Sequence, residues 1–462
     1  MTTFMPGSAD QPGCFKAYDV RGRIGVDFSA AIAGRIAAAF VGVVGVGPVA
    51  LGQDCRPSSP AIADAVAAAL MAAGVQVLDL GLCGTEEVYF ATGHLGALGG
   101  IMVTASHNPA DYNGLKLVQA GAAPLTPDQF AAIRQWTETR RTAESRPGGT
   151  RRNIGATRSA YVDCVMGFTD PARLAPLHIL VNPGNGAAGP TFDAIAVRLA
   201  ALGAPLRFTR INHTPDPAFP NGIPNPLLAE NRPATAAAVV AAGADFGVAW
   251  DGDFDRCFLF DHLGRFVPGE FVVGMLGQAF LQREPGATVV HDPRVVLNTR
   301  DLVTTWGGSA VMARTGHAYA KQVMRDSGAV YGGEISAHHY FRDFFCCDSG
   351  MIPWLVVAAL LSQSGARLAD LLTERQNLFP SSGEVNFSLA DPAGAMARVV
   401  GAFAPGALHC DETDGTSLEF ADWRFNLRAS NTEPLVRLNV ESRGDWALMA
   451  TKLAEIRAIL TG

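Results

Sequence analysis

One local plan recurs three times along this chain: a short apolar strand, a polar or glycine-rich loop, an alanine-rich helix, a glycine stop and a second strand. The copies begin at Val49, His178 and Ala287. In the first copy Ser58 suits the start of the helix and Gly74 suits its end. Each copy predicts a βαβ unit. Because the copies lie more than a hundred residues apart, they predict three tandem α/β domains and not a solenoid, whose period is far shorter.

The end of the chain follows a different pattern. Runs in which apolar and polar residues alternate begin at Glu384, Thr416 and Glu433, and a helical segment closes the chain. Alternation with a period of two predicts strands with one buried face. The fold class is therefore α/β, with three tandem mixed α/β domains of related topology plus a C-terminal α+β domain, and we expect the active site in the central cleft. The expected domains are residues 1–150, 151–261, 262–378 and 379–462, with a linker near residues 145–153.

Composition excludes several classes of protein. A formal charge of −7 argues against a general nucleic-acid binder, which needs a basic surface. The eight cysteines lack CxxC spacing, so neither a zinc ribbon nor a disulfide framework is predicted. The first residues lack a basic flank followed by an apolar stretch, and Arg35, Asp64 and many glycines interrupt the most apolar segments. We expect a cytoplasmic protein that binds neither nucleic acid nor a membrane.

A polar turn follows the apolar strand predicted at residues 101–103. The turn carries Ser106, His107 and Asn108. Open α/β sheets bind their ligands at such carboxyl ends of strands. Considered alone, a Ser-His-Asn-Pro turn more often caps backbone groups. A serine hydrolase is a further alternative, but the G-x-S-x-G elbow and an oxyanion glycine cluster are absent from the sequence.

Three aspartates, Asp251, Asp253 and Asp255, stand at alternate positions after another apolar strand. Like charges about 4 Å apart repel by roughly 4 kcal/mol near a protein surface, so their convergence in a tight turn requires a cation. Oxygen ligands favour Mg²⁺ over a transition metal. An EF-hand is excluded because Arg256 and His262 stand where Gly and Glu are needed. A solvated acidic turn is the alternative for this motif alone, although the apolar flanks argue against it.

Two later loops offer groups that suit a phosphorylated sugar. Glu334, Ser336 and His338 follow a Gly-Gly turn, and short donors and acceptors of this kind suit sugar hydroxyls. Alone, such residues are more often plain surface. The second loop combines an arginine with hydroxyl and amide groups, which can bind a phosphate. Considered alone, the same residues fit an ordinary polar hairpin equally well. This second loop comprises Arg428, Ser430, Asn431 and Thr432, with Arg437 further on.

Together these segments resemble the α-D-phosphohexomutase superfamily. The segments AYDVRG, TASHNP with Lys116, DGDFDR, GGEISAHH and RASNT occur in the family's order and approximate spacing, and the match covers the whole chain. The resemblance implies that Ser106 carries a phosphoryl group. It also implies an Mg²⁺ site, whose ligands are Asp251, Asp253, Asp255 and the phosphoryl group on Ser106.

The same resemblance implies roles for the remaining residues. The catalytic residues would be Ser106, His107, Lys116 and Arg21. Lys116 could act as a proton shuttle if nearby cations lowered its pKa. Arg294 stands where many relatives carry lysine, whose hydrogen-bonding geometry differs. The substrate-binding residues would be Tyr18, Asn108, Arg256, Arg294, His317, Glu334, Ser336, His338, Arg428, Ser430, Asn431, Thr432 and Arg437.

Longer segments resemble the bacterial phosphomannomutase branch of the superfamily, which shares two departures from the broad pattern, Gln53 and Phe254. This resemblance implies an isomerase that interconverts mannose 6-phosphate and mannose 1-phosphate and supplies GDP-mannose synthesis. A hexose 1,6-bisphosphate would serve as intermediate and activator, with Mg²⁺ as cofactor. The alternatives are a phosphoglucomutase, a dual-specificity enzyme or, more remotely, a non-catalytic sugar-phosphate sensor. We expect hexose phosphates as partners and a monomer or homodimer.

Overall fold

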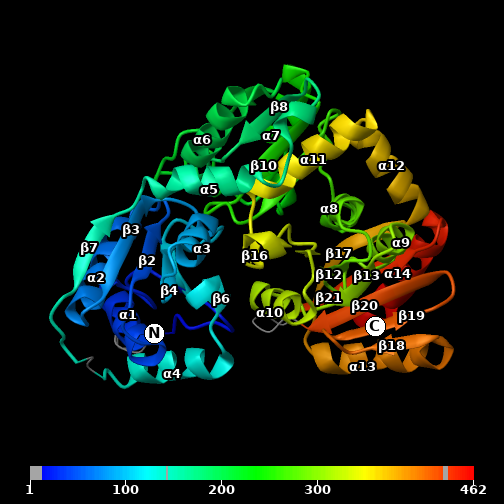
Figure 1. The fold of residues 1–462 in the computed structure, drawn as a ribbon. Helices are drawn as coiled ribbons and strands as arrows, with labels where there is room; N and C mark the ends of the chain where they lie inside the picture. The colour runs from blue at the N-terminus through cyan, green and yellow to red at the C-terminus, as the bar shows by residue number, and fades with distance from the viewer. Residues whose placement is uncertain (1–12, 142–143, 430–434) are drawn as a thin grey trace. The chain divides into compact units, whose positions relative to one another are not determined.

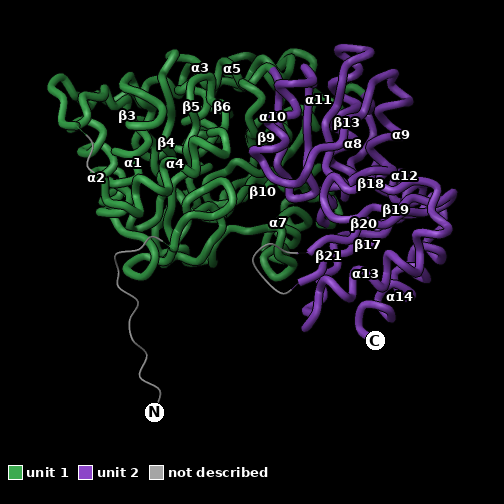
Figure 2. Tube along the Cα trace, turned by 90° about the horizontal axis from the view of Figure 1, so that it is seen from below, with its two compact units in different colours: residues 1–265, 343–363 green, residues 266–342, 364–462 purple. Residues whose placement is uncertain are grey.

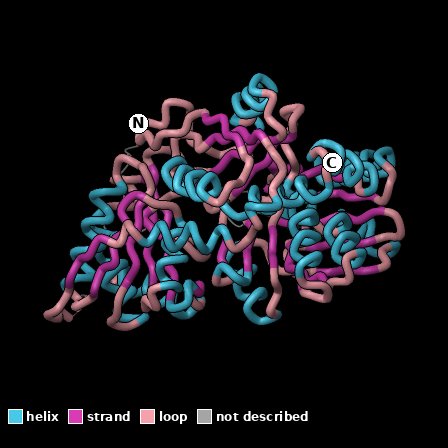
Figure 3. The backbone as a smooth tube through the Cα atoms, turned by 45° about the horizontal axis from the view of Figure 1, so that its top comes forward, coloured by secondary structure: helices cyan, strands magenta, loops and turns pink. Residues whose placement is uncertain are grey.

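The computed structural model describes residues 13–141, 144–429 and 435–462. The chain forms two compact units (Figure 2). Unit 1 comprises residues 1–265 and 343–363, and unit 2 comprises residues 266–342 and 364–462. Helices and strands alternate through most of both units (Figure 3).

The first sheet of unit 1 is mixed (Figure 1). Its strand order is β1-β5-β4-β2-β3-β7, and β6 pairs with β5. The strands β4, β2, β3 and β7 run parallel, whereas β1, β5 and β6 add antiparallel pairs. The strands are β1 (Val20–Arg23), β2 (Val49–Gln53), β3 (Gln76–Leu82), β4 (Gly99–Val103), β5 (Tyr112–Gln119), β6 (Ala123–Pro124) and β7 (Thr150–Asn153).

Helices cover both faces of this sheet because its central strands are apolar on both sides. Val49 and Leu51 of β2 pack into one core with three helices, whereas Ala50 packs into a second core with α3. Successive strand residues point to opposite faces, so one strand contributes to both cores. The helices are α1 (Ala30–Val44), α2 (Ser59–Ala72), α3 (Thr85–His94) and α4 (Pro127–Glu138).

A second sheet in unit 1 has the order β11-β10-β8-β9. β10, β8 and β9 are parallel, and β11 returns antiparallel to β10. A later helix belongs to this unit because its Trp354 packs against Phe192 and Phe208. The elements are α5 (Thr157–Met166), β8 (His178–Asn182), α6 (Ala188–Ala201), β9 (Arg207–Arg210), α7 (Pro233–Ala242), β10 (Phe246–Trp250), β11 (Cys257–Asp261), β16 (Cys347–Asp348) and α11 (Met351–Ser364).

Unit 2 contains a third α/β layer. Its strands β13, β12 and β14 are parallel neighbours, and β15 returns antiparallel to β14. The elements are α8 (Gly269–Arg283), β12 (Thr288–His291), α9 (Leu297–Thr305), β13 (Ser309–Met312), α10 (His317–Ser327), β14 (Tyr331–Gly333), β15 (His339–Phe341) and α12 (Leu368–Leu378).

The C-terminal part of unit 2 is an antiparallel sheet in the order β17-β21-β20-β19-β18. Alternate residues such as Phe425 and Leu427 of β20 and Leu438 of β21 form its core with two helices. The elements are β17 (Ser381–Ser388), α13 (Pro392–Phe403), β18 (His409–Asp411), β19 (Thr416–Glu419), β20 (Trp423–Ala429), β21 (Leu435–Ser442) and α14 (Trp446–Thr461).

The structure confirms the predicted fold class and all three βαβ units. The parallel pairs β2 with β3, β8 with β9 and β12 with β13 are each joined through one helix. Gly74 follows α2 with a φ of 83°, as a helix stop requires. Ser58 occupies the N-cap of α2, but within the described residues its side chain makes no capping hydrogen bond. The linker predicted at 145–153 is wrong in its second half, because Thr150–Asn153 pairs with β3 as β7.

In the part of the chain that the structure describes, each helix taken singly is too short or too polar to cross a bilayer. The successive helices α11 and α12 meet the length and composition criteria only when they are counted together. The central turns of α11 are buried in the protein.

Candidate active site

Ser106 lies in a tight loop just after β4. The end of β4 is paired with the end of β2, so residues 54–56 lie beside residues 104–106. Ser106 has a φ of 51°, in the left-handed region that is costly for a residue other than glycine. The Asn108 backbone N–H closes the turn on Ala105 O at 2.9 Å. The loop is therefore held in an unusual backbone conformation, which is common at functional sites.

The Ser106 hydroxyl is buried and points at the aspartate turn that follows β10. Its Oγ donates a hydrogen bond to Asp251 Oδ2 at 2.7 Å and lies 3.1 Å from His107 Nδ1. Ser106 itself is 2% exposed. Two motifs that are far apart in the sequence therefore meet at this hydrogen bond.

The three aspartates converge as the sequence predicts. Asp251, Asp253 and Asp255 are all buried, and each offers an oxygen within 4.8 Å of the others. Among the described residues, none donates a hydrogen bond to the buried Asp253 Oδ1. Burial of such an oxygen is costly unless a cation or donor satisfies it. The donor set, made only of carboxylates, fits a hard divalent cation.

Phe254 lies within the aspartate turn and has a left-handed backbone conformation. Its φ is 47°, a value that is costly for a residue other than glycine. The Phe254 ring packs on Gly84, where an added Cβ would come within 2.2 Å of the ring. The missing side chain of Gly84 therefore makes room for the Phe254 ring.

Lys116, on β5, lies against two of the aspartates. Its Nζ donates to Asp253 Oδ2 at 2.7 Å and also to Asp255 Oδ2. Burial lowers the pKa of Lys116, but the two carboxylates outweigh burial and raise the pKa overall. A proton shuttle would need nearby cations that lower the pKa of Lys116. The nearest charges are instead negative and raise this pKa. Lys116 is a protonated donor here.

Arg256 connects the aspartate turn to the serine loop. Its Nε and Nη2 donate to Asp251 Oδ2 at 2.9 and 2.8 Å, and Nη2 lies 3.4 Å from Ser106 Oγ. Nη2 also donates to His107 Nδ1. Burial and this guanidinium hold the pKa of His107 well below its usual value. His107 is therefore a neutral imidazole whose Nδ1 accepts.

The N-terminal motif is close to the serine loop. Arg21 Nη1 donates to Asn108 Oδ1 at 2.9 Å, and Arg21 Nε donates to Asp19 Oδ2 at 2.8 Å. Tyr18 is 37% exposed. The predicted residue Arg21 thus reaches the loop through Asn108. We call Ser106, Asp251, Asp253, Asp255, Lys116 and Arg256 the serine centre.

Several polar residues around the serine centre escaped the sequence analysis. Thr85 Oγ1 donates to Asp253 Oδ2 at 2.6 Å from the start of α3. Asp54 and Arg56 follow β2 and contact the serine loop. The sequence indicates Asp54 and Arg56 only by their position directly after a predicted strand. Polar residues that follow neighbouring parallel strands meet at one edge of a sheet.

Three predicted arginines of unit 2 converge on a carboxylate that the sequence analysis did not single out. Arg294, Arg428 and Arg437 each contact Glu384 of β17, with N···O distances of 3.1, 3.2 and 3.1 Å. Although burial raises the pKa of Glu384, the three guanidinium groups lower it overall. We call these four residues the arginine cluster. Ser430, Asn431 and Thr432 lie outside the described residues.

The predicted sugar loop adjoins the arginine cluster within unit 2. Glu334 is buried, accepts hydrogen bonds from Tyr340 at 2.6 Å and Ser336 at 3.2 Å, and lies 3.7 Å from Arg294. The rings of His317 and His338 are 6.4 Å apart and only partly buried. The polar groups of this loop and the cations of the arginine cluster therefore occur side by side in unit 2.

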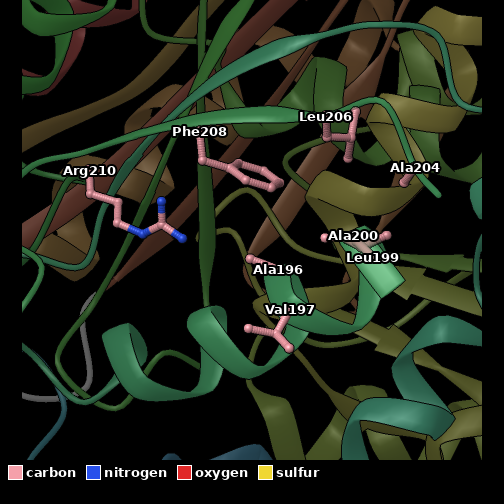
Figure 4. A pocket seen from close by; sticks show the side chains of 8 residues that line it. All are labelled: Ala196, Val197, Leu199, Ala200, Ala204, Leu206, Phe208 and Arg210. Atoms are coloured by element: carbon pink, nitrogen blue, oxygen red, sulfur yellow. The ribbon is translucent and has the colours of Figure 1, made fainter. Parts of the chain in front are cut away.

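An apolar hollow of about 260 Å³ lies in unit 1 between α6 and β9 (Figure 4). Its one charged lining residue, Arg210, pairs with Asp193 at 3.0 Å. The lining includes none of the predicted site residues; it consists of Ala196, Val197, Leu199, Ala200, Ala204, Leu206, Phe208 and Arg210.

Family models for each part of the chain match it in order. The matching descriptions are phosphoglucomutase/phosphomannomutase alpha/beta/alpha domains I, II and III and the C-terminal domain of the same proteins. They match residues 13–144, 159–264, 268–379 and 384–459.

Individual relatives are similar over nearly their whole length. A phosphomannomutase of Salmonella montevideo is 54% identical, with 97% of this chain and 98% of the relative covered. A Xanthomonas campestris protein named for phosphohexose mutases is 52% identical, with 97% and 99% covered. The crystal structure of a phosphoglucomutase/phosphomannomutase family protein from Burkholderia thailandensis superposes with a TM-score of 0.85 at 30% identity, covering 99% and 98%. The chain therefore belongs to the phosphoglucomutase/phosphomannomutase family, the α-D-phosphohexomutases.

Proposed function

We propose that this protein is a phosphomannomutase that interconverts mannose 6-phosphate and mannose 1-phosphate through phosphorylated Ser106. The observation that carries the proposal is the Ser106 hydroxyl, buried and bonded to Asp251 at 2.7 Å within a cluster of three aspartates. Phosphoryl transfer depends mainly on positioning and on charge stabilisation, and this centre supplies fixed groups for both. The full-length likeness to proteins named phosphomannomutase favours mannose over other hexoses.

The reaction has two transfers. In the first, the free hydroxyl oxygen of the hexose monophosphate attacks the phosphorus on Ser106, the bond from phosphorus to Oγ breaks, and a hexose 1,6-bisphosphate forms. In the second, Ser106 Oγ attacks the other phosphorus, whose bond to the sugar oxygen breaks. Over the cycle the sugar hydroxyl that reacts loses a proton and the hydroxyl that is released gains one, so atoms and charge balance. Loss of the bisphosphate would leave Ser106 without its phosphoryl group, so added bisphosphate serves as activator.

The residues of the serine centre and their neighbours His107 and Arg21 have different roles in this reaction. Arg256 lies 3.4 Å from Ser106 Oγ and offers its guanidinium to the transferring group. Lys116, fixed on two aspartates, is a protonated donor at the same place. Neutral His107 accepts at Nδ1 and borders the hydroxyl. Arg21 holds Asn108 and with it the loop.

The aspartates would hold Mg²⁺, and the unsatisfied Oδ1 of Asp253 fits that role. The ligands would be Asp251, Asp253, Asp255 and the phosphoryl group on Ser106. When bound, Mg²⁺ offsets the negative charge of a phosphoryl group. A centre with three carboxylates and a phosphoserine otherwise carries a large excess of negative charge.

In unit 2, Arg294, Arg428 and Arg437 would bind the phosphate that is not reacting, with Ser430, Asn431 and Thr432 as further donors. Guanidinium forks suit phosphate oxygens. Glu334, Ser336 and His338 would read the sugar hydroxyls, and Tyr18 and His317 would complete the substrate contacts. We assign the four domains to residues 1–153, 154–261, 262–378 and 379–462, with the first boundary moved from residue 150 so that β7 stays in the first sheet. We also assign the protein to the cytoplasm, its product to GDP-mannose synthesis, and its assembly to a monomer or homodimer.

The test compares Ser106→Ala with Ser309→Ala, an exposed serine of β13, in the presence of Mg²⁺ and glucose 1,6-bisphosphate. Ser106→Ala should lose mutase turnover and the 80-dalton mass increment of a phosphoserine, whereas Ser309→Ala should keep both. Full activity of Ser106→Ala would refute the phosphoserine route.

A phosphoglucomutase or dual-specificity enzyme is the second candidate, favoured by the name of the Xanthomonas relative. Initial rates on mannose 1-phosphate and glucose 1-phosphate separate the two. A higher kcat/KM on the glucose compound would overturn the preference for mannose. Absence of both turnover and a phosphorylated fraction would favour a sugar-phosphate sensor.

A further inference from the structure

Arg56 is a buried arginine that no predicted motif includes. It is 1% exposed and follows the strand β2, whose end pairs with the end of β4. Its side chain reaches under the loop that carries Ser106, and the Phe219 ring lies 5.8 Å from its guanidinium carbon. Burial of a guanidinium is costly unless its donors are satisfied. The hydrogen-bond partners of Arg56 therefore indicate the role of this buried side chain.

The guanidinium binds the backbone at four places, three in the serine loop and one at the first residue of β5. Nη2 donates to Ser106 O at 2.8 Å and to Asn108 O at 2.6 Å. Nη1 donates to Pro109 O at 2.6 Å and to Tyr112 O at 3.0 Å. The two terminal nitrogens of arginine carry four hydrogens, and four carbonyl oxygens receive them. Lysine has only three donors on one atom and cannot reproduce this planar fork.

A second set of bonds holds the other side of Ser106. Its backbone N–H donates to Thr104 Oγ1 at 2.8 Å, and Thr104 Oγ1 donates to Asp54 Oδ2 at 2.7 Å. Asp54 Oδ2 also lies 3.2 Å from Arg56 Nε. The N–H and the C=O of Ser106 are thus both tied to one ion pair, Asp54 with Arg56.

These bonds account for the strained conformation of Ser106. Its φ of 51° persists only if the surroundings fix it. With the loop turned in this way, Oγ faces Asp251 at 2.7 Å. Each of the four bonds from Arg56 ends on a backbone oxygen, so Arg56 acts on the hydroxyl through the backbone.

We infer that Arg56, with Asp54 and Thr104, is a positioning residue for phosphoryl transfer: it fixes the backbone of the serine loop so that Oγ keeps its direction as hydroxyl and as phosphoester. This inference rests on the proposed function. The loop must present the same oxygen in both transfers, and a displacement of about 1 Å in a reacting group can cost about 100-fold in rate. Among the described residues, the hydrogen-bond partners of Arg56 include none of the unit 2 residues proposed to bind the sugar and the second phosphate, so KM should respond less than kcat.

The experiment compares Arg56→Lys with Arg23→Lys. Arg23 is an exposed residue that pairs with Asp111 of the same loop at 2.7 Å. Arg56→Lys should lower kcat for mannose 1-phosphate about 100-fold with KM within about threefold, whereas Arg23→Lys should stay within about twofold of the wild type. A kcat within threefold of the wild type in folded Arg56→Lys, or a rise in KM at unchanged kcat, would overturn the inference. If the wild type itself does not turn over, the proposed function fails first.

A second pair of variants decides the question if Arg56→Lys does not fold. Thr104→Ser keeps the hydroxyl between Asp54 and Ser106 N–H, and Thr104→Val removes it at nearly constant volume. Thr104→Val should lower kcat about tenfold at unchanged KM and unchanged Ser106 phosphorylation by intact mass, and Thr104→Ser should restore it. Equal rates for the two variants would contradict the inference.

Discussion

The serine centre of unit 1 and the arginine cluster of unit 2 have opposite arrangements of charge. In unit 1 three buried aspartates converge, with Lys116 and Arg256 at their sides and one carboxylate oxygen of Asp253 left over. In unit 2 three arginines share the carboxylate of Glu384. Asp292 and Asp414 each pair with one of these arginines. Like charges gather inside a protein only with counter-charges. The first arrangement is therefore suited to a bound cation and the second to an anion.

The first prediction removes charge from the aspartate turn. Asp253→Asn should lower kcat about 1,000-fold with little change in KM, because the neutral amide binds a divalent cation poorly and leaves Lys116 with one carboxylate fewer. Rates measured over a Mg²⁺ titration check this. Asp128→Asn, in the first turn of α4, serves as control. A variant that keeps a tenth of the wild-type kcat and the same Mg²⁺ dependence would show that Asp253 is not a metal ligand.

The second prediction concerns a buried carboxylate of unit 2 outside the arginine cluster. Burial raises the pKa of Glu270 to about 7, although hydrogen bonds from Ser381 and a backbone amide oppose the shift. The folded chain then holds a proton that the unfolded chain releases above about pH 4.5. The contribution of Glu270 to stability is therefore full below that pH and is lost as the pH rises through 7.

Glu270→Gln removes this pH dependence. Relative to the wild type, the variant should gain stability from pH 5 to pH 8, by at most about 3 kcal/mol. Thermal unfolding midpoints at the two pH values measure the difference. A constant difference between variant and wild type across this range would show that Glu270 is ionised throughout, like the arginine-bound Glu384.

The third prediction has the smallest effect and the opposite sign from the first. Glu384→Gln should lower KM for mannose 1-phosphate about fivefold, or ~1 kcal/mol, because the three arginines then lose the one carboxylate that they share and that competes with a phosphate. Asp292 and Asp414 still pair with Arg294 and Arg428, so the effect is modest. Glu374→Gln, on the exposed side of α12, is the matched control. A raised KM would mean that Glu384 mainly orders the three arginines.

The repeated βαβ plan and the alternating C-terminal strands were readable because apolar periodicity is a local property. Elements at Val49, His178 and Ala287 followed directly from it. The boundary near residue 150 could not be read in this way. Thr150–Asn153 is a short, exposed edge strand without an apolar signal, and only its pairing with β3 makes it part of the first sheet.

The sequence by itself determined the family, the α/β class and the residue types of the serine centre, since these are written in contiguous motifs. The tertiary structure decided which of these residues meet. It brought Ser106 to Asp251, set Lys116 among carboxylates that raise its pKa, and gathered three arginines on Glu384. The position of Arg56 under the serine loop was also decided by the tertiary structure. Its four partners are backbone carbonyl oxygens, which every residue type carries, so the sequence could not indicate these contacts.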